Sequence, residues 1–252
     1  MIDLTGKVVL VTGGSRGIGA GIVEVLTGAG ADVILHYNSG KKEAEAVDNK
    51  CGAAKIHLVQ ADLTDPHAPE HLWEKSVVWK GRIDVLVNNA AVRLSASIDG
   101  PFQELDDAWT KSMRVNAIAP AHLIRLAMPH FRKLGGGIII SMSSRPAFRG
   151  DRPDFFHDGG SKAALTALAR GVARFFSHEE ILSYVVLPGM IASEQLEDFE
   201  RHYGLEEALR EIPLGELGKP RDVANVVAFL ASGLARYAVG GTIDVAGASC
   251  LR

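Results

Sequence analysis

The chain has 252 residues, 47% of them hydrophobic, which is enough for one large α/β domain over residues 1–252. Its formal net charge of -3 and the lack of any long run of one sign predict no nucleic-acid partner and no polybasic membrane patch. No apolar run reaches membrane-spanning length, and the first residues lack a signal-peptide pattern. The two cysteines, Cys51 and Cys250, have no metal-like spacing and indicate a reduced, cytoplasmic protein.

The first elements enclose a glycine-rich turn. Residues 7–11 are apolar and rich in β-branched side chains, as in a buried strand, and residues 18–29 place apolar side chains at helical spacing. Between them lies Thr-Gly-Gly-Ser-Arg-Gly-Ile-Gly, residues 12–19. Glycine tolerates unusual backbone angles and close approach, and the N–H groups of a helix start attract phosphate. The turn therefore predicts a dinucleotide site, although a glycine turn without a ligand is the alternative.

Strand and helix patterns then alternate to the end of the chain. Further strands are expected at residues 32–37, 55–59, 83–87, 137–142, 181–187 and 242–245. Helices are expected at residues 41–50, 69–80, 106–134, 158–177, 194–211 and 220–230, with Pro120 and Pro129 able to bend or interrupt the long one.

This alternation predicts an α/β fold, namely a single doubly wound parallel sheet with helices on both faces. Ligands of such sheets bind outside the carboxyl ends of the strands. Side chains that follow different strands can therefore share one site. Polar or glycine-rich segments stand at these ends at residues 12–19, 37–39, 62, 88–91, 143–144 and 188–191.

Several of these segments resemble the motifs of the short-chain dehydrogenase/reductase family. The similarity extends over nearly the whole chain and includes the glycine turn, Asn89-Ala90, Asn116, Ser144 and Lys162, in the family's order. The resemblance implies a Rossmann-type domain with NAD(P)-linked interconversion of a carbonyl and an alcohol. It also implies a small-molecule substrate and a homo-oligomer, either a tetramer or a dimer.

The end of the second expected strand favours NADP(H) over NAD(H). Enzymes that prefer NAD place an acid there, which accepts from the ribose 2′-OH and repels a 2′-phosphate. Here Tyr37, Asn38 and Ser39 occupy that place, and Arg16 in the first turn can reach a phosphate with a planar cation. The alternative is that Arg16 is only solvated and Tyr37 only packs.

The resemblance assigns the remaining cofactor contacts residue by residue. Asp62 corresponds to the acid beside the adenine, although a helix cap is its alternative role. The full set expected to hold the cofactor comprises Gly13, Ser15, Arg16, Gly17, Ile18, Gly19, Tyr37, Asn38, Ser39, Asp62, Leu63, Asn89, Ala90, Lys162, Pro188, Gly189 and Ile191.

The resemblance also implies a catalytic set, from which this chain departs at one position. In the family a Tyr transfers the proton, a Lys four residues later lowers the pKa of that Tyr, a Ser binds the substrate oxygen, and an Asn positions a water. Lys162 matches the Lys, Asn116 the Asn, and Ser144 the Ser, with Ser143 as second choice. Asp158 stands where the Tyr is expected.

Aspartate is a poor replacement for that tyrosine. Its carboxyl group reaches several ångströms less far than a phenol oxygen, and at pH 7 an aspartate is an anion with no proton to give. Because Asp158 and Lys162 are spaced i,i+4, an ion pair within the helix is expected.

Three interpretations of Asp158 remain open. The protein is an NADP-linked enzyme that uses Ser144, Lys162 and a water in place of the tyrosine. Alternatively, it binds the cofactor with little or no activity, or its sequence is an inactivated variant of a Tyr-bearing parent. In the family, a segment matching residues 193–213 acts as a substrate lid, and the helix of Lys162 often pairs between subunits.

Overall fold

The computed structural model describes residues 2–52, 55–193 and 204–251. In this part of the chain seven parallel strands form one sheet in the order β3-β2-β1-β4-β5-β6-β7, the doubly wound arrangement expected from the sequence. The strands are β1 (Val8–Val11), β2 (Asp32–Tyr37), β3 (Ile56–Gln60), β4 (Val85–Asn88), β5 (Gly137–Met142), β6 (Ile181–Pro188) and β7 (Thr242–Val245).

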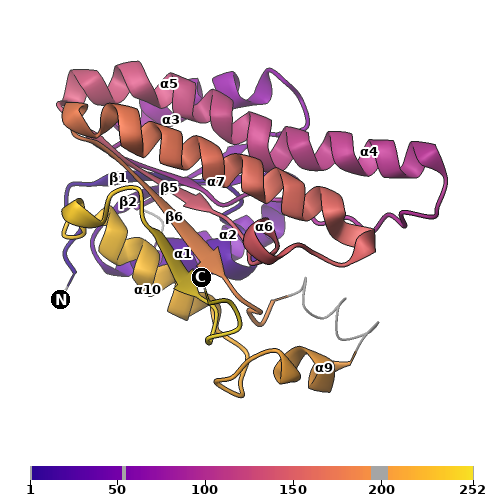
Figure 1. The fold of residues 1–252 in the computed structure, drawn as a ribbon. Helices are drawn as coiled ribbons and strands as arrows, with labels where there is room; N and C mark the ends of the chain where they lie inside the picture. The colour runs from indigo at the N-terminus through magenta and orange to yellow at the C-terminus, as the bar shows by residue number, and fades with distance from the viewer. Residues whose placement is uncertain (1, 53–54, 194–203, 252) are drawn as a thin grey trace.

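Helices cover both faces of the sheet (Figure 1). One face carries α1 (Gly17–Gly28), α2 (Lys41–Cys51) and α10 (Pro220–Ala231), and the other carries α3 (Ala68–Lys80), α4 (Phe102–Met113), α5 (Ala119–Leu134) and α7 (Phe156–Phe176). Short helical segments are a π-helical turn (Arg114–Ile118), α6 (Pro146–Arg149), α9 (Leu205–Arg210) and 3-10 turns at Pro153–Phe155, Ser177–Glu179 and Arg236–Ala238.

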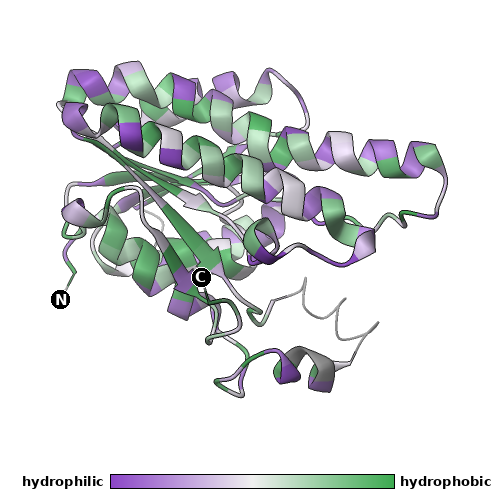
Figure 2. Ribbon diagram, in the orientation of Figure 1, coloured by the Kyte–Doolittle hydropathy of each residue, from purple (hydrophilic) through white to green (hydrophobic). Residues whose placement is uncertain are grey.

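The apolar runs explain this layering. All residues of β1, β4 and β6 are buried, as expected for parallel strands covered on both sides. Figure 2 shows apolar residues concentrated on the strands, with polar residues on the outer faces of the helices. The side chains of alternate strand residues enter two separate clusters, one on each face of the sheet.

Most expected elements are found within a few residues of their expected bounds. The long helix expected over residues 106–134, which its prolines were expected to bend or interrupt, is interrupted by the π-helical turn at Arg114–Ile118. The interruption ends two residues before Pro120. Proline has no backbone N–H, so it cannot donate a hydrogen bond to a carbonyl of the preceding turn. Most of the helix expected over 194–211 falls on residues 194–203, which lie outside the described residues, and only α9 is seen.

Within the described residues, no helix is both long enough and apolar enough to cross a membrane. The same part of the chain contains no group of three or more His, Cys, Asp or Glu side chains that could hold a metal ion. Cys51 and Cys250 are free thiols.

Candidate active site

One cavity of about 960 Å³ opens at the carboxyl ends of the strands, where the topology predicts a ligand site. Every residue expected to hold the cofactor lines it, from Gly13 in the first turn to Ile191 after β6. Ser144, Asp158 and Lys162 from the expected catalytic set line it as well, whereas Asn116 does not. The topology has therefore brought together segments that are up to 178 residues apart, as the range 13–191 gives.

The glycine turn fits a phosphate through its close packing. A side chain at Gly19 would place its Cβ 1.9 Å from the Gly13 carbonyl oxygen, and one at Gly13 would lie 2.9 Å from the Ala90 Cα. Gly13 also has a φ of 65°, in the left-handed region. Arg16 precedes α1 without making a side-chain cap, so the first N–H groups of the helix keep their capacity to bind an anion.

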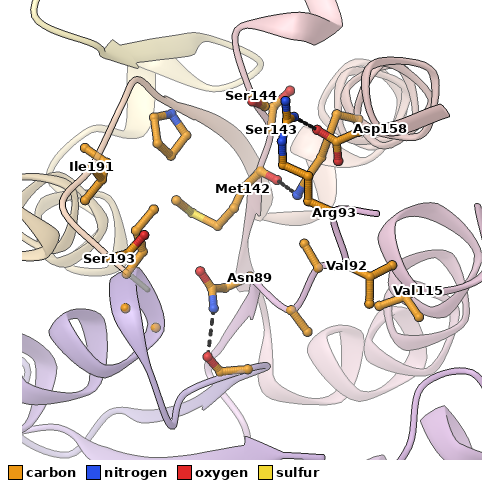
Figure 3. A pocket seen from close by; sticks show the side chains of 18 of the residues that line it. Asn89, Val92, Arg93, Val115, Met142, Ser143, Ser144, Asp158, Ile191 and Ser193 are labelled. Carbon is orange, nitrogen blue, oxygen red and sulfur yellow. Dashed lines mark hydrogen bonds and ion pairs between the residues drawn. The ribbon is translucent and has the colours of Figure 1, made fainter. Parts of the chain in front are cut away.

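Hydrogen bonds from the neighbouring strand end hold this turn in place. Asn89 Nδ2 donates to the carbonyl oxygens of Thr12 at 2.9 Å and Gly13 at 3.0 Å, and Figure 3 shows the Asn89 side chain directed at the turn. The Asn89 and Ala90 N–H groups both donate to Thr12 Oγ1. The β4 end and the glycine turn therefore form one rigid wall of the cavity.

His36 on β2 supports the turn from the other side, and the sequence interpretation missed it. Its Nδ1 accepts a hydrogen bond from the Gly13 N–H at 3.0 Å, so Nε2, 3.0 Å from the Ala61 carbonyl oxygen, carries the proton. Burial lowers the pKa of the imidazole to about 4, opposed by the Ala61 hydrogen bond and by Asp62. Neutral His36 thus acts as a hydrogen-bond acceptor for the turn.

We expect stability to fall as the pH is lowered from about 6.5 to about 4, because of His36. The folded-state pKa is about 4 and the unfolded reference is 6.5, so the unfolded chain binds the extra proton first. The contribution is on the order of 3 kcal/mol, fully present above pH 6.5 and lost as the pH approaches 4. Urea unfolding at several pH values measures it. If His36→Gln loses as much stability over this window as the natural chain, His36 is not the cause.

Polar residues after β2 line one end of the cavity. Tyr37, Asn38 and Ser39 follow β2 and line the cavity together with Arg16, and no acidic side chain occupies the end of that strand. Asp62 also lines the cavity, and its Oδ1 accepts from the Thr64 N–H at 3.0 Å. Asp62 therefore shapes a local turn at the edge of the cavity.

The prediction of an ion pair between Asp158 and Lys162 is wrong. Lys162 Nζ donates instead to the Met142 carbonyl oxygen at 2.9 Å, at the end of β5. Burial lowers the pKa of the Lys162 amine, and the negative charge of Asp158 opposes this effect. An i,i+4 pair contributes only about 0.3–0.5 kcal/mol, so hydrogen bonds to the rest of the fold override it.

Asp158 is paired with Arg93, a residue that the sequence interpretation did not single out. Arg93 Nη1 lies 2.6 Å from Asp158 Oδ2 and 2.8 Å from Asp151 Oδ2 (Figure 3). Burial acts to lower the pKa of Arg93, but the Asp151 hydrogen bond and the charges of Asp158 and Asp151 outweigh it, so the pKa is raised. A basic residue four positions after Asn89 was the only available signal in the sequence.

The structure distinguishes the two candidate serines. Ser143 Oγ is buried and lies 2.7 Å from Thr166 Oγ1, so it bonds to α7. Ser144 is partly accessible and lines the cavity, where its hydroxyl can reach a ligand (Figure 3). Ser144 is therefore the serine placed to bind a substrate oxygen.

Asn116 is fully buried in the π-helical turn. Its Oδ1 accepts from the Val92 N–H at 2.8 Å, and its Nδ2 donates to the Val92 carbonyl oxygen at 3.0 Å and to Ser161 Oγ at 3.0 Å. The side chain thus fixes the backbone next to Arg93 and connects it to α7.

The cavity mouth contains further charges. Glu211 Oε2 pairs with Arg145 at 3.2 Å and with Arg149 at 2.8 Å. Burial, followed by the positive charge of Arg149, lowers the pKa of Arg145. One carboxylate therefore joins α6 to the segment after α9 across the cavity mouth.

Comparisons with known proteins agree with this geometry. Residues 13–247 match the model of a family described as enoyl-(acyl carrier protein) reductase. An uncharacterized oxidoreductase of Methylorubrum extorquens is 36% identical over 98% of this chain and 99% of its own length. A 3-oxoacyl-[acyl-carrier-protein] reductase of Aquifex aeolicus is 33% identical over 98% of each chain.

Two solved structures share the whole fold. A dehydrogenase/reductase of Sinorhizobium meliloti 1021 superposes with a TM-score of 0.89 at 33% identity, over 98% of this chain and 96% of that one. A blue fluorescent protein from a metagenomic library, solved in complex with NADPH, superposes with a TM-score of 0.90 at 35% identity, over 99% of this chain and 100% of that one.

Proposed function

Because this chain belongs to the short-chain dehydrogenase/reductase family, we infer that it is an NADP(H)-dependent oxidoreductase that interconverts a carbonyl and an alcohol by hydride transfer. The observation that carries this proposal is that every expected cofactor contact lines the cavity at the carboxyl ends of the strands. The similar structure solved with NADPH supports the choice of cofactor.

The residues around the cavity fit NADPH in kind and in order. The N–H groups at the start of α1 face a pyrophosphate, Arg16 and the Asn38–Ser39 segment suit a 2′-phosphate, and Asp62 and Leu63 border the adenine. Asn89, Ala90 and Lys162 suit the nicotinamide ribose, and Pro188, Gly189 and Ile191 the carboxamide. When bound, NADPH supplies the hydride.

The chain's own groups then orient the substrate and stabilise charge. Ser144 donates to the substrate oxygen, and the amine of Lys162, held by the Met142 carbonyl, binds the cofactor ribose. The carboxylate of Asp158 is engaged in its ion pair with Arg93, so the product oxygen takes its proton from water that enters the open cavity.

Titration with both reduced cofactors tests the proposal. We expect NADPH to bind at least tenfold more tightly than NADH and to raise the melting temperature, because a ligand of the native state stabilises it. Replacing Asn38 with aspartate introduces a charge that repels the 2′-phosphate and is expected to remove most of this preference. Tighter binding of NADH to the natural chain would contradict the choice of cofactor, and binding of neither would contradict the function.

We also propose that the protein is a cytoplasmic homo-oligomer, a tetramer or a dimer, acting on a small molecule. The family resemblance suggested that α7 pairs between subunits. Its apolar residues Leu165, Ala169 and Val172 are buried within the subunit, so they are mostly not available for that contact. Phe102 on α4 and Phe175 on α7 are instead 80% and 65% exposed, which supports association of the outer faces of these helices. The free thiols support a reducing compartment, and light scattering tests the mass against that of the 26.9 kDa chain.

A further inference from the structure

Arg93 is held beside Asp158, the residue that stands at the family's tyrosine position. It follows β4, and Asn116 fixes the backbone of the adjacent Val92 on both its N–H and its carbonyl. The guanidinium stacks on Phe155, with 4.0 Å between the guanidinium carbon and the ring centroid. Figure 3 shows the side chain extending from the Val92 side of the cavity to Asp158. Its direction is therefore fixed by backbone, ring and carboxylates together.

The hydrogen bonds to Asp151 and Asp158 occupy one side of the Arg93 guanidinium and leave another edge unused. Nη1 and Nη2 donate to the two oxygens of Asp151, at 2.8 and 3.3 Å, and Nη1 also donates to Asp158. The opposite edge carries the Nε–H and the second Nη2–H, and these have no partner among the described residues. A guanidinium edge is a planar pair of parallel donors. Because Arg93 lines the cavity and is 31% exposed, this edge suits two acceptor oxygens that lie side by side.

The carboxylates paired with Arg93 favour a neutral ligand on that edge. Asp151 and Asp158 already balance the positive charge of the guanidinium, so an anionic ligand would gain little from binding there. The neighbouring cavity wall includes the apolar side chains of Val92, Val115 and Met142 (Figure 3). The ligand that fits is therefore uncharged, carries two adjacent oxygens and has an apolar body.

We propose that Arg93 is a catalytic residue of this protein and that its substrates are neutral vicinal dicarbonyl compounds. This inference rests on the proposed NADP(H) function. Nε and Nη2 of Arg93 bind the two carbonyl oxygens, and Asp151, Asp158 and Phe155 hold the guanidinium in position. Asp158 is thus a positioning residue, acting through Arg93.

The proposed step requires no acidic side chain. A hydride adds to one carbonyl carbon and forms the new C–H bond, while the π electron pair of that C=O bond moves to its oxygen. The guanidinium stabilises the resulting alkoxide, and a water molecule supplies the proton and leaves as hydroxide, which takes up a proton from bulk solvent. The product is a hydroxy ketone, and the cofactor leaves as NADP⁺. The adjacent carbonyl group withdraws electrons and makes the alkoxide a weaker base, so water suffices as the acid.

A matched set of substrates tests the proposal. 1-Phenyl-1,2-propanedione has both oxygens, propiophenone and phenylacetone each lack one, and phenylglyoxylate replaces the second ketone with a carboxylate. We expect kcat/KM with NADPH for the dione to exceed that of the other three at least tenfold. Assays use borate-free buffer, and mass spectrometry checks that no arginine adduct forms. Equal rates on the dione and either monoketone would overturn the proposal.

Variants assign the selectivity to Arg93. Arg93→Gln is expected to lower kcat/KM for the dione at least tenfold, and Arg93→Lys to recover little, since a point charge cannot replace two parallel donors. Arg132→Gln, which removes a surface arginine paired with Glu179, serves as the matched control and is expected to change nothing at the site. An Arg93→Gln variant with the natural kcat/KM for the dione would refute the assignment.

Binding measurements without turnover distinguish a failure of this inference from a failure of the proposed function. Calorimetry of the dione in the presence of NADP⁺ is expected to give binding that Arg93→Gln weakens, while the affinity for NADPH stays unchanged. If NADPH binds but the dione does not, the substrate class is wrong and the cofactor assignment stands. If NADPH itself fails to bind, the proposed function and this inference both fail.

Discussion

Replacement of Asp158 by tyrosine is expected to raise the NADPH-linked reduction of a simple ketone about a hundredfold, the scale of regaining a general acid. The introduced phenol would lie one helical turn before Lys162, whose charge lowers the pKa of a neighbouring phenol. Ser144 already lines the same cavity. Initial rates with propiophenone measure the gain, because the natural chain lacks an acid for this weakly activated ketone.

The control for this variant is Asp158→Phe. Phenylalanine has the ring of tyrosine without the hydroxyl, so it removes the Arg93 ion pair in the same way but supplies no proton. We expect no gain from it. Similar rates for the two variants would mean that release of Arg93, rather than proton donation, changed the activity. If a folded Asp158→Tyr variant binds NADPH and shows no gain, a side chain at position 158 is not placed to donate a proton to the substrate.

Substitution of Gly19 by alanine is expected to weaken NADPH binding about 10- to 100-fold and to destabilise the fold by about 1–3 kcal/mol. The added Cβ would lie 1.9 Å from the Gly13 carbonyl oxygen and 2.7 Å from Asn89 Nδ2. Relief of this overlap requires the turn to move, which breaks the hydrogen bond from Asn89 to Gly13. Calorimetry with NADPH and urea unfolding measure the two effects.

Gly28→Ala provides the matched control in the same helix. No heavy atom lies within 4 Å of the position that its Cβ would take, so alanine fits there. We expect an increase in stability of about 0.4–1 kcal/mol and unchanged NADPH binding, because alanine restricts the unfolded chain more than glycine does. If both substitutions weaken binding equally, close packing at Gly19 is not what shapes the turn.

The sequence was sufficient for the sheet, the layers and the cavity. Apolar runs such as β1 and β6 are unmistakable, and parallel topology forces their carboxyl ends to one edge. The expected cofactor contacts meet in one cavity for that reason. Their chemical roles remain predictions that the experiments above test.

The sequence could not give the pairings that depend on side-chain direction. Arg93 and Asp158 are 65 residues apart, and His36 and Gly13 are 23 apart. No local spacing rule links either pair. The i,i+4 rule instead suggested Asp158 with Lys162, whose amine bonds to the Met142 carbonyl. Local propensities are weaker than the hydrogen bonds that packing makes available, so the charged groups could be named from the sequence but not matched to one another.

In the π-helical turn at Arg114–Ile118, the number of residues matters more than which residues they are. The turn widens the helix at Asn116, whose buried amide bonds to the backbone of Val92 from there. Removing one residue there would restore a continuous α-helix and close the wide turn from which Asn116 reaches Val92. A local repair of the helix would thus disconnect the loop of Arg93 from its anchor.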